Sequence, residues 1–261
     1  MLRKLLKYDL KYSYKALVVF YILSILFAVL SRLCLLSDSN IMIILYKVNC
    51  GITISMMVNI LINNLLRIWV RFNNNIYKDE SYLTHTLPVE KRDIYSSKIL
   101  AAIISVFTSI IVIFICLVLC YYSKENIEFL KNSLNIVANA YSSSITNVLL
   151  TLFLILFLEF TFIILTGFDA LILGHKSNDN KMIKSVIYGL VIYMIFNVLL
   201  LLIVYLLGTF NTDIMAIFSH ESIKIETIKI VLNVIMIVYV IYLIILYLFG
   251  IKEFKKGVNV E

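Results

Sequence analysis

The chain has 261 residues, of which 62% are hydrophobic and 15% are charged, and its mean hydropathy is +0.97. Soluble domains carry about a quarter charged and about half apolar residues, so this composition excludes an ordinary soluble domain. The formal net charge of +7 requires no nucleic acid as a partner. Basic residues beside membrane spans set the orientation of the protein and attract anionic membrane lipid.

The N-terminal segment, residues 1–15, is basic, and its apolar residues recur at helical spacing: Leu2, Leu5, Leu6, Leu10 and Tyr14. This pattern predicts an amphipathic helix that lies in the membrane interface before the chain turns into its first span. The apolar stretch that follows is too long for the core of a signal peptide, and no small-residue cleavage site follows it. We therefore expect an uncleaved first span.

Six apolar stretches are long enough to cross a bilayer as helices, which takes about 20 residues each. They lie at about 16–36, 41–66, 99–122, 145–173, 185–208 and 229–251. Most of the 23 Lys and Arg residues fall in the segments that six crossings place on the side of the termini. Because basic residues favour the cytoplasmic side, both termini are expected there. The sequence predicts an all-α polytopic membrane protein with a single transmembrane domain over residues 1–261.

The second predicted span is the least uniform in composition. A stripe of mostly polar residues recurs on it at helical spacing, at Asn49, Thr53, Met56, Asn59, Asn63 and Arg67. Amide side chains that face lipid lack hydrogen-bond partners, so this stripe is expected to face protein or a water-filled cavity. Two interpretations remain open: the stripe is a contact between helices of the bundle, or it lines a translocation path or a seam between subunits.

Residues 77–98 form a polar cytoplasmic connection between the second and third spans and contain the only proline. Asp79 is a favourable N-cap, and Glu80 suits the start of a helix. We expect a short helix over 80–87 that presents Tyr82, Leu83 and Leu87 and ends at Pro88, followed by a new helix into the third span. Exposed aromatic and aliphatic side chains on such a projection suit docking into a groove of a soluble partner.

Two other features of the spans are a pair of cysteines and an acidic residue. Cys116 and Cys120 share one face of the third span, and we interpret them as small packing residues in a helix interface. Glu159 lies deep in the fourth span, where a charged carboxylate costs about 2.5–3.5 kcal/mol. Glu159 is therefore either protonated and hydrogen-bonded within the bundle, or paired with a cation or water. The first state is structural and the second indicates a role in transport.

The sequence lacks the signatures of covalent chemistry. It contains no phosphate-binding GxxxxGK[ST] loop, no HExxH and no GxSxG. Its three histidines, His85, His175 and His220, lie in loops or at span ends, without a second His or a carboxylate at metal-ligand spacing. We expect that the chain is not an enzyme and holds no metal or cofactor. Energy for uphill transport would come from an ion gradient or from another subunit.

Residues KDESYLTHTLPVEKRDIYSSKIL, starting at Lys78, resemble the DEGYLTxTLPVxxxxxxxSK segment of small bacterial permeases of the type 2 ABC exporter superfamily. The LGHK sequence at Leu173–Lys176 is similar to a second, shorter motif of that group. Ser81 stands where Gly is usual, and Glu90 stands where a Ser or Thr cap is common. The predicted topology of six spans, with both ends inside and an amphipathic N-terminal helix, agrees with the resemblance over nearly the whole chain.

The resemblance implies a permease in the bacterial plasma membrane whose connection between spans 2 and 3 docks on a separate ATPase subunit. ATP and Mg²⁺ would bind to that partner, and a second permease subunit, identical or homologous, would complete the exporter. The cargo would be hydrophobic or peptide-like. Carried over onto this chain, the docking residues would be Asp79, Glu80, Tyr82, Leu83, Thr84, Leu87 and Pro88.

Two alternatives from other classes remain. One is a stand-alone secondary transporter that uses Glu159 as a proton site, although no inverted repeat or pair of broken helices was found. The other is a membrane sensor or immunity protein that binds its ligand without moving it. An adjacent reading frame that encodes an ATPase would separate the exporter from both.

Overall fold

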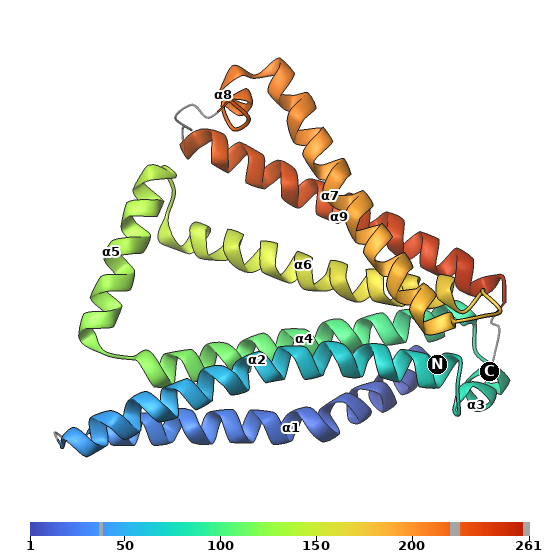
Figure 1. Ribbon diagram of the computed structural model, residues 1–261, viewed down its shortest axis with the longest axis horizontal. Helices are drawn as coiled ribbons and strands as arrows, with labels where there is room; N and C mark the ends of the chain where they lie inside the picture. The colour runs from blue at the N-terminus through green and yellow to red at the C-terminus, as the bar shows by residue number, and fades with distance from the viewer. Residues whose placement is uncertain (37–38, 220–224, 258–261) are drawn as a thin grey trace. The chain divides into compact units, whose positions relative to one another are not determined.

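The computed structural model describes residues 1–36, 39–219 and 225–257, and over these residues the chain is helical without a strand (Figure 1). Its contacts divide the chain into two compact units, Met1–Phe129 and Leu130–Glu261. We call them the N-terminal unit and the C-terminal unit. The predicted all-α membrane fold is confirmed, because six of the helices are long and apolar enough to cross a membrane.

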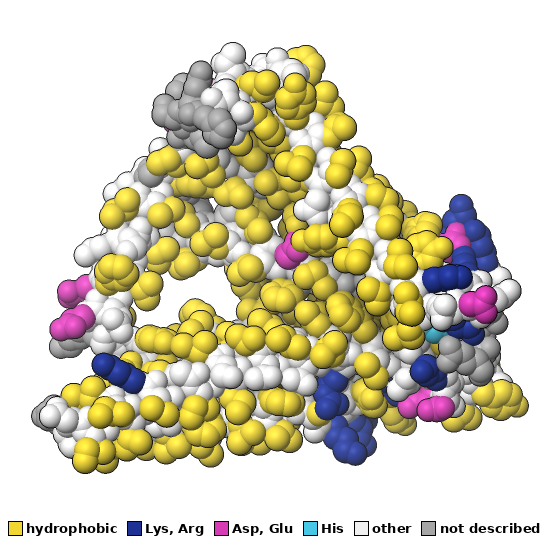
Figure 2. Space-filling view, in the orientation of Figure 1, with side chains coloured by type: hydrophobic (Ala, Val, Ile, Leu, Met, Phe, Trp, Pro, Cys, Tyr) yellow, Lys and Arg dark blue, Asp and Glu magenta, His cyan; other side chains and the backbone are white. Residues whose placement is uncertain are grey.

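The helices have the following bounds. The N-terminal unit contains α1 (Leu2–Cys34), α2 (Asn40–Ile76), α3 (Ser81–Thr86) and α4 (Lys91–Tyr121). The boundary between the units falls within α5 (Lys124–Ala140). The C-terminal unit continues with α6 (Ile145–Gly174), α7 (Lys181–Phe210), α8 (Thr212–Met215) and α9 (Ile225–Lys255). Figure 2 shows hydrophobic side chains along the long helices and most charged side chains near their ends, as a lipid environment requires.

The predicted amphipathic segment and the first span form one continuous helix, α1, of 33 residues. The predicted turn between them is absent, because no residue in this stretch breaks the hydrogen-bond ladder. The buried positions of α1 recur every three or four residues and are mostly small or polar: Asp9, Ser13, Leu17, Tyr21, Ser24, Ala28 and Ser31. Small side chains let helix backbones approach closely in membranes, so this face packs against α2 and α4.

Apolar and polar contacts alternate along the core of the N-terminal unit. Cys116 and Cys120 are fully buried in a cluster with Ala28, Cys50 and Met57, which agrees with the interpretation of these cysteines as packing residues. A buried polar cluster lies nearer the middle of the bundle. Its members are joined at 2.8–3.1 Å: Tyr21, Asn64, Ser105 and Ser109.

The C-terminal unit is built by α6 packing against α7 and α9. Its centre is aromatic: Phe162 of α6 and Phe196 of α7 have ring centroids 4.5 Å apart. Tyr239 and Tyr242 of α9 lie within 5 Å of the Phe196 ring. Buried aromatic pairs of this kind contribute about 0.5–1.5 kcal/mol beyond the area that they bury.

Candidate functional site

The connection between α2 and α4 forms a short helix as predicted, but its start differs. Helix α3 covers Ser81–Thr86, and its N-cap position is held by Glu80 rather than by Asp79. Asp79 is exposed and caps nothing in the described structure. The prediction of Asp79 as the cap was wrong because the Glu80 carboxylate turns back to α2 and fixes where the helix begins. Leu87 is extended, with ψ of 134°, as expected for a residue that precedes a proline.

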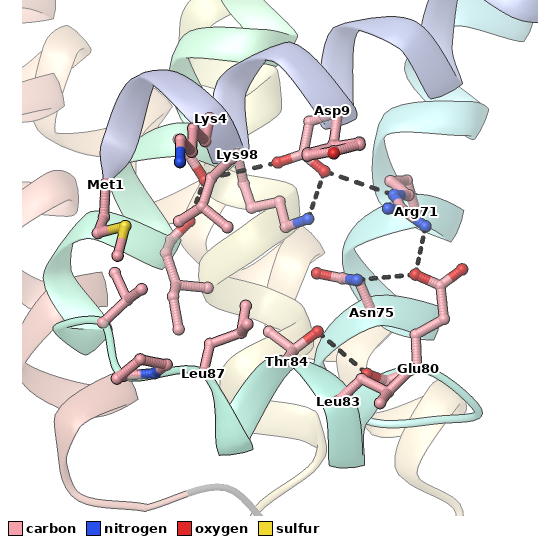
Figure 3. Close-up of a pocket in the computed structure, with 16 residues that line it drawn as sticks. Met1, Lys4, Asp9, Arg71, Asn75, Glu80, Leu83, Thr84, Leu87 and Lys98 are labelled. Atoms are coloured by element: carbon pink, nitrogen blue, oxygen red, sulfur yellow. Dashed lines mark hydrogen bonds and ion pairs between the residues drawn. The ribbon is translucent and has the colours of Figure 1, made fainter.

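A chain of charges ties α3 to the membrane helices (Figure 3). The ammonium of Lys98, on α4, lies 2.5 Å from a carboxylate oxygen of Asp9, on α1. The same oxygen of Asp9 lies 3.5 Å from Arg71 Nε, on α2. The Arg71 guanidinium then donates to Glu80 at 2.5 Å, and Asn75 donates to the same Glu80 oxygen at 2.8 Å. Residues of α1, α2 and α4 therefore meet the start of α3 through one network.

This network is largely removed from solvent at its centre. The side chains of Asp9 and Lys98 are each 6% exposed and that of Arg71 is 15% exposed, whereas Glu80, at the edge, is 44% exposed. The guanidinium of Arg71 also lies 4.4 Å from the centre of the Tyr12 ring. Buried charges in such an arrangement are tolerated only when each has its partner, so the four side chains depend on one another.

The surroundings of Glu80 set its charge state. Partial burial raises the pKa of this carboxyl, but the hydrogen bond from Asn75 and the positive charge of Arg71 outweigh it. The net effect is a pKa below the usual value for Glu, so the carboxylate is ionised and holds its two donors at neutral pH.

A cavity of about 530 Å³ lies between the first turns of α1 and the connection that contains α3. Lys98 and Asn75 form its polar side, as Figure 3 shows, together with Arg71 and Asp9. The remaining walls are mainly apolar and include Leu5, Leu83, Leu87, Val89 and Ile94. The volume falls within the range of small-molecule sites, which is about 300–1,000 Å³.

The predicted docking residues separate into two groups. Tyr82, Leu83 and Leu87 are exposed by 77%, 67% and 43%, as the sequence predicted, and Pro88 is also exposed. Thr84 is buried and donates a hydrogen bond to the Glu80 carbonyl at 3.0 Å. Thr84 and Glu80 therefore hold the segment in place, while the apolar side chains are displayed.

The polar stripe on α2 does not form one surface. Thr53 is fully buried, and Asn49 approaches Cys34 Sγ at 3.8 Å, so this part faces α1. The amides of Asn59 and Asn63 donate back to carbonyls of their own helix and lie toward the open side of the unit. The buried amide is that of Asn64, which sequence reasoning missed because the spacing fits Asn63 equally well.

Glu159 is half-buried on α6 and accepts a hydrogen bond from the hydroxyl of Tyr239 on α9. This contact matches the structural alternative, in which the carboxyl is hydrogen-bonded within the bundle. Tyr239 was not predicted, since a tyrosine in an apolar helix gives no signal of its partner. Farther along α6, Thr166 and Asp169 are also buried.

The LGHK sequence joins the end of α6 to α7 and α9. A methyl group added to Gly174 would lie 2.0 Å from Ser185 Oγ and 2.6 Å from the Ser185 backbone nitrogen, so only glycine allows this approach. His175 is buried, and Lys176 forms an ion pair with Glu253 of α9. His220, the third histidine, lies outside the described residues.

Together these features define a multi-pass helical membrane protein with a charge-anchored, apolar projection between its second and third spans. Comparisons with protein-family models, curated proteins and solved structures found no match to this chain. A functional assignment therefore depends on the residues themselves.

Proposed function

We propose that this chain is the permease subunit of an ATP-driven ABC exporter in a bacterial plasma membrane and that α3 docks on a separate ATPase subunit. The observation that carries the proposal is the display of Tyr82 and Leu83 on a helix of six residues, outside the packed spans. Tyr82 and Leu83 leave most of their side-chain surface exposed on a short, polar connection, although Leu83 also lines the cavity. This exposed pair suits an anchor in a partner's groove.

The anchoring of α3 supports the same function. A docking element must transmit force to the spans, and a freely hinged loop would absorb it. Here Glu80 joins the start of α3 to Arg71 of α2, and Arg71 lies beside Asp9 of α1, which pairs with Lys98 of α4. A displacement of α3 by an ATPase would therefore reach three spanning helices through short contacts.

A second permease subunit belongs to this proposal, and the open side of α2 is the surface that we assign to it. Asn59 and Asn63 each donate one hydrogen bond to a carbonyl of their own helix, and both bonds lie at exposed positions of α2. Crosslinking from a single cysteine at position 63 is expected to trap a neighbouring copy. A cysteine at position 53 is the matched negative control, because Thr53 is fully buried against the bundle.

The test of docking is the double substitution Tyr82→Ser with Leu83→Ser, followed by co-purification with the proposed ABC ATPase subunit. Truncation of interface anchors costs about 2 kcal/mol or more, which corresponds to about thirtyfold weaker binding. The matched control is Phe129→Ser with Leu130→Ser, an adjacent aromatic–aliphatic pair on α5 that is also exposed. Undiminished ATPase binding by the first variant would refute the docking role.

The alternative of a proton-coupled transporter would need Glu159 to exchange protons with water during the cycle. Its carboxyl instead accepts a hydrogen bond from the Tyr239 hydroxyl, which joins α6 to α9 beside packed aromatic rings. That arrangement supports a structural contact, so we favour the exporter.

A further inference from the structure

The helix α5 differs from the six long helices in length and composition. It has 17 residues, which corresponds to about 25 Å at a rise of 1.5 Å per residue. Four of these residues are charged: Lys124, Glu125, Glu128 and Lys131. A membrane span takes about 20 mostly apolar residues. Helix α5 is therefore too short and too polar to cross a membrane, and it does not belong to the spans.

The path of the chain fixes where both ends of α5 lie. Because α1, α2 and α4 are the first three helices able to cross a membrane, the end of α4 lies on the side opposite the N-terminus, and α6 starts from that side. Residues 122–123 join α4 to α5, and residues 141–144 join α5 to α6. The longer link reaches at most about 18 Å, which is less than the length of α5. The helix therefore cannot stand upright on the membrane surface and runs along it.

The side chains of α5 separate into two arcs around the helix. At 3.6 residues per turn, all four charges and three of the four asparagines fall within about 120° of the circumference, which we call the polar arc. The rest of the circumference, which we call the apolar arc, is apolar except at Asn126 and Ser133. The amide of Asn126 donates a hydrogen bond to the Tyr121 carbonyl at 2.9 Å, so its polarity is satisfied within the chain. This division is typical of helices that lie in a membrane interface.

Much of the apolar arc is exposed in the described structure. Phe129 and Ile136 are both 71% exposed, and Leu130 and Val137 are exposed as well. Leu130 and Val137 lie opposite the centre of the polar arc, so they point into the membrane when the charges point to water. An exposed apolar face on a helix that is held along a membrane surface fits lipid.

Tyrosines flank α5 at both ends, as expected for a helix at the level of the lipid headgroups. Tyr121 and Tyr122 precede it and are exposed, and Tyr141 follows it. Tyrosine is enriched at the boundary between membrane and water, where its ring lies among the headgroups. The Arg32 guanidinium lies 5.6 Å from the centre of the Tyr122 ring, and the Lys229 ammonium lies 5.9 Å from the centre of the Tyr141 ring. Both ends of the helix therefore carry the aromatic and basic residues of an interface.

We propose that α5 is an interfacial helix whose apolar arc enters the lipid leaflet on the side of the membrane opposite the termini, with Leu130 and Val137 deepest. Its polar arc faces water. The two basic and two acidic residues of α5 cancel, so the attachment depends on apolar contact and not on anionic lipid. Lipid is favoured over a second copy of the chain, because the short links hold the helix along a surface that lipid already surrounds. This contact is independent of the proposed exporter function, since it requires only the six crossings.

The experiment uses spin labels on the whole chain, reconstituted in vesicles of dioleoyl phosphatidylcholine, in a background without native cysteines. Single cysteines at positions 130 and 137 test the apolar arc, and matched controls at positions 128 and 135 test the polar arc. All four positions are exposed. A label at position 198, an exposed residue within α7, is the reference for lipid. Power saturation measures how often each label collides with oxygen, which dissolves in hydrocarbon, and with a nickel chelate, which stays in water.

We expect the labels at positions 130 and 137 to collide mainly with oxygen, as the label at position 198 does, and those at positions 128 and 135 to collide mainly with the nickel chelate. The same pattern is expected when dioleoyl phosphatidylglycerol is added to the vesicles. Frequent nickel collisions at all four positions would overturn the proposal, because water would then surround the helix. Rare collisions with both reagents at positions 130 and 137 would overturn it in favour of a protein contact, such as a second copy of the chain. Lipid contact that requires phosphatidylglycerol would show that charge, and not the apolar arc, holds the helix.

Discussion

Loss of Lys98 alone is expected to destabilise the N-terminal unit, whereas loss of Lys98 together with Asp9 is expected to be nearly neutral. In Lys98→Met, the Asp9 carboxylate stays 94% buried, since its side chain is 6% exposed, and it loses its contact of 2.5 Å. Removing one partner of a buried ion pair costs about 3–5 kcal/mol. Arg71 remains 3.5 Å away and compensates in part. We therefore expect a loss near the lower end of that range.

The double variant Lys98→Met with Asp9→Asn removes both charges, so no buried ion is left without its partner. Buried pairs replaced by neutral side chains of similar volume are often as stable as the original. Since the double variant is nearly neutral, the interaction energy from the double-mutant cycle should be at least as large as the loss in Lys98→Met alone, about 3 kcal/mol, at the upper end of the range for residues in one network. Arg71 keeps Glu80 in every member of the cycle.

The assay is the midpoint of denaturation of the purified chain by a denaturing detergent, followed by far-UV circular dichroism for all four members of the cycle. A probe on α7, in the C-terminal unit, serves as the internal reference. A single variant Lys98→Met as stable as the double variant would show that Asp9 is not held by this pair. The four charged side chains would then not depend on one another.

Three further predictions concern the rest of the chain. Gly174→Ala should markedly impair folding of the C-terminal unit, since the added carbon meets the Ser185 backbone nitrogen at 2.6 Å. The control is Gly51→Ala, where an added carbon has no neighbouring atom within 4 Å. This control should be neutral or slightly stabilising in thermal denaturation. Tyr239→Phe should lower the free energy of unfolding by about 1 kcal/mol, because the hydrogen bond to Glu159 is lost. Glu159→Gln should preserve assembly and transport. Normal assembly with failed transport in this variant would indicate that Glu159 has a role in transport. In a background without native cysteines, an impermeant reagent should label a cysteine at position 131 from outside and cysteines at positions 91 and 181 only from inside. Labelling of position 91 from outside would contradict the topology. Lys224, which is also expected outside, lies beyond the described residues.

The sequence predicted the parts of this structure that depend on composition over many residues. Hydropathy located all six spans, because the cost of placing polar groups in lipid acts on each stretch separately. Hydropathy predicted the ends of the helices less accurately. The second span was expected to end near residue 66, whereas α2 continues to Ile76. The last turns of α2 are polar, and they remain helical because they pack against α3 and supply Arg71 and Asn75 to the network.

The candidate site was only partly predictable, because pairing between helices depends on how each is rotated. The exposed Tyr82 and Leu83 followed from their position in a polar connection. The partners of Glu80 could not be predicted, since the sequence identifies Arg71 and Lys98 only as basic residues at the ends of spans. One signal was present: Asp9 is the only acidic residue among the first 15, and it lies on the helix face opposite the basic residues of this segment. An isolated acid on the packed face of a basic helix indicates a buried cation nearby.

The attachment of α3 through Glu80 should depend on pH, and the direction follows from its depressed pKa. Because the folded pKa lies below the usual value of a Glu carboxyl, the contact with Arg71 and Asn75 is fully present above that usual value. It is lost as the pH falls through the lower, folded value, which requires acid below about pH 4.3. Protonation leaves Arg71 with Asp9 alone, and the start of α3 is released.

A spin label on a cysteine at position 82, which replaces the exposed Tyr82, reports this release as increased mobility. We expect restricted motion from pH 7 to pH 5 and a rise in mobility below that window. The control is Glu80→Gln, which cannot ionise and should show high mobility at every pH. A transition of equal size in the Glu80→Gln protein would assign the effect to another titrating group. A label that stays restricted at low pH would show that Thr84 and the apolar contacts beneath α3 hold the helix without Glu80.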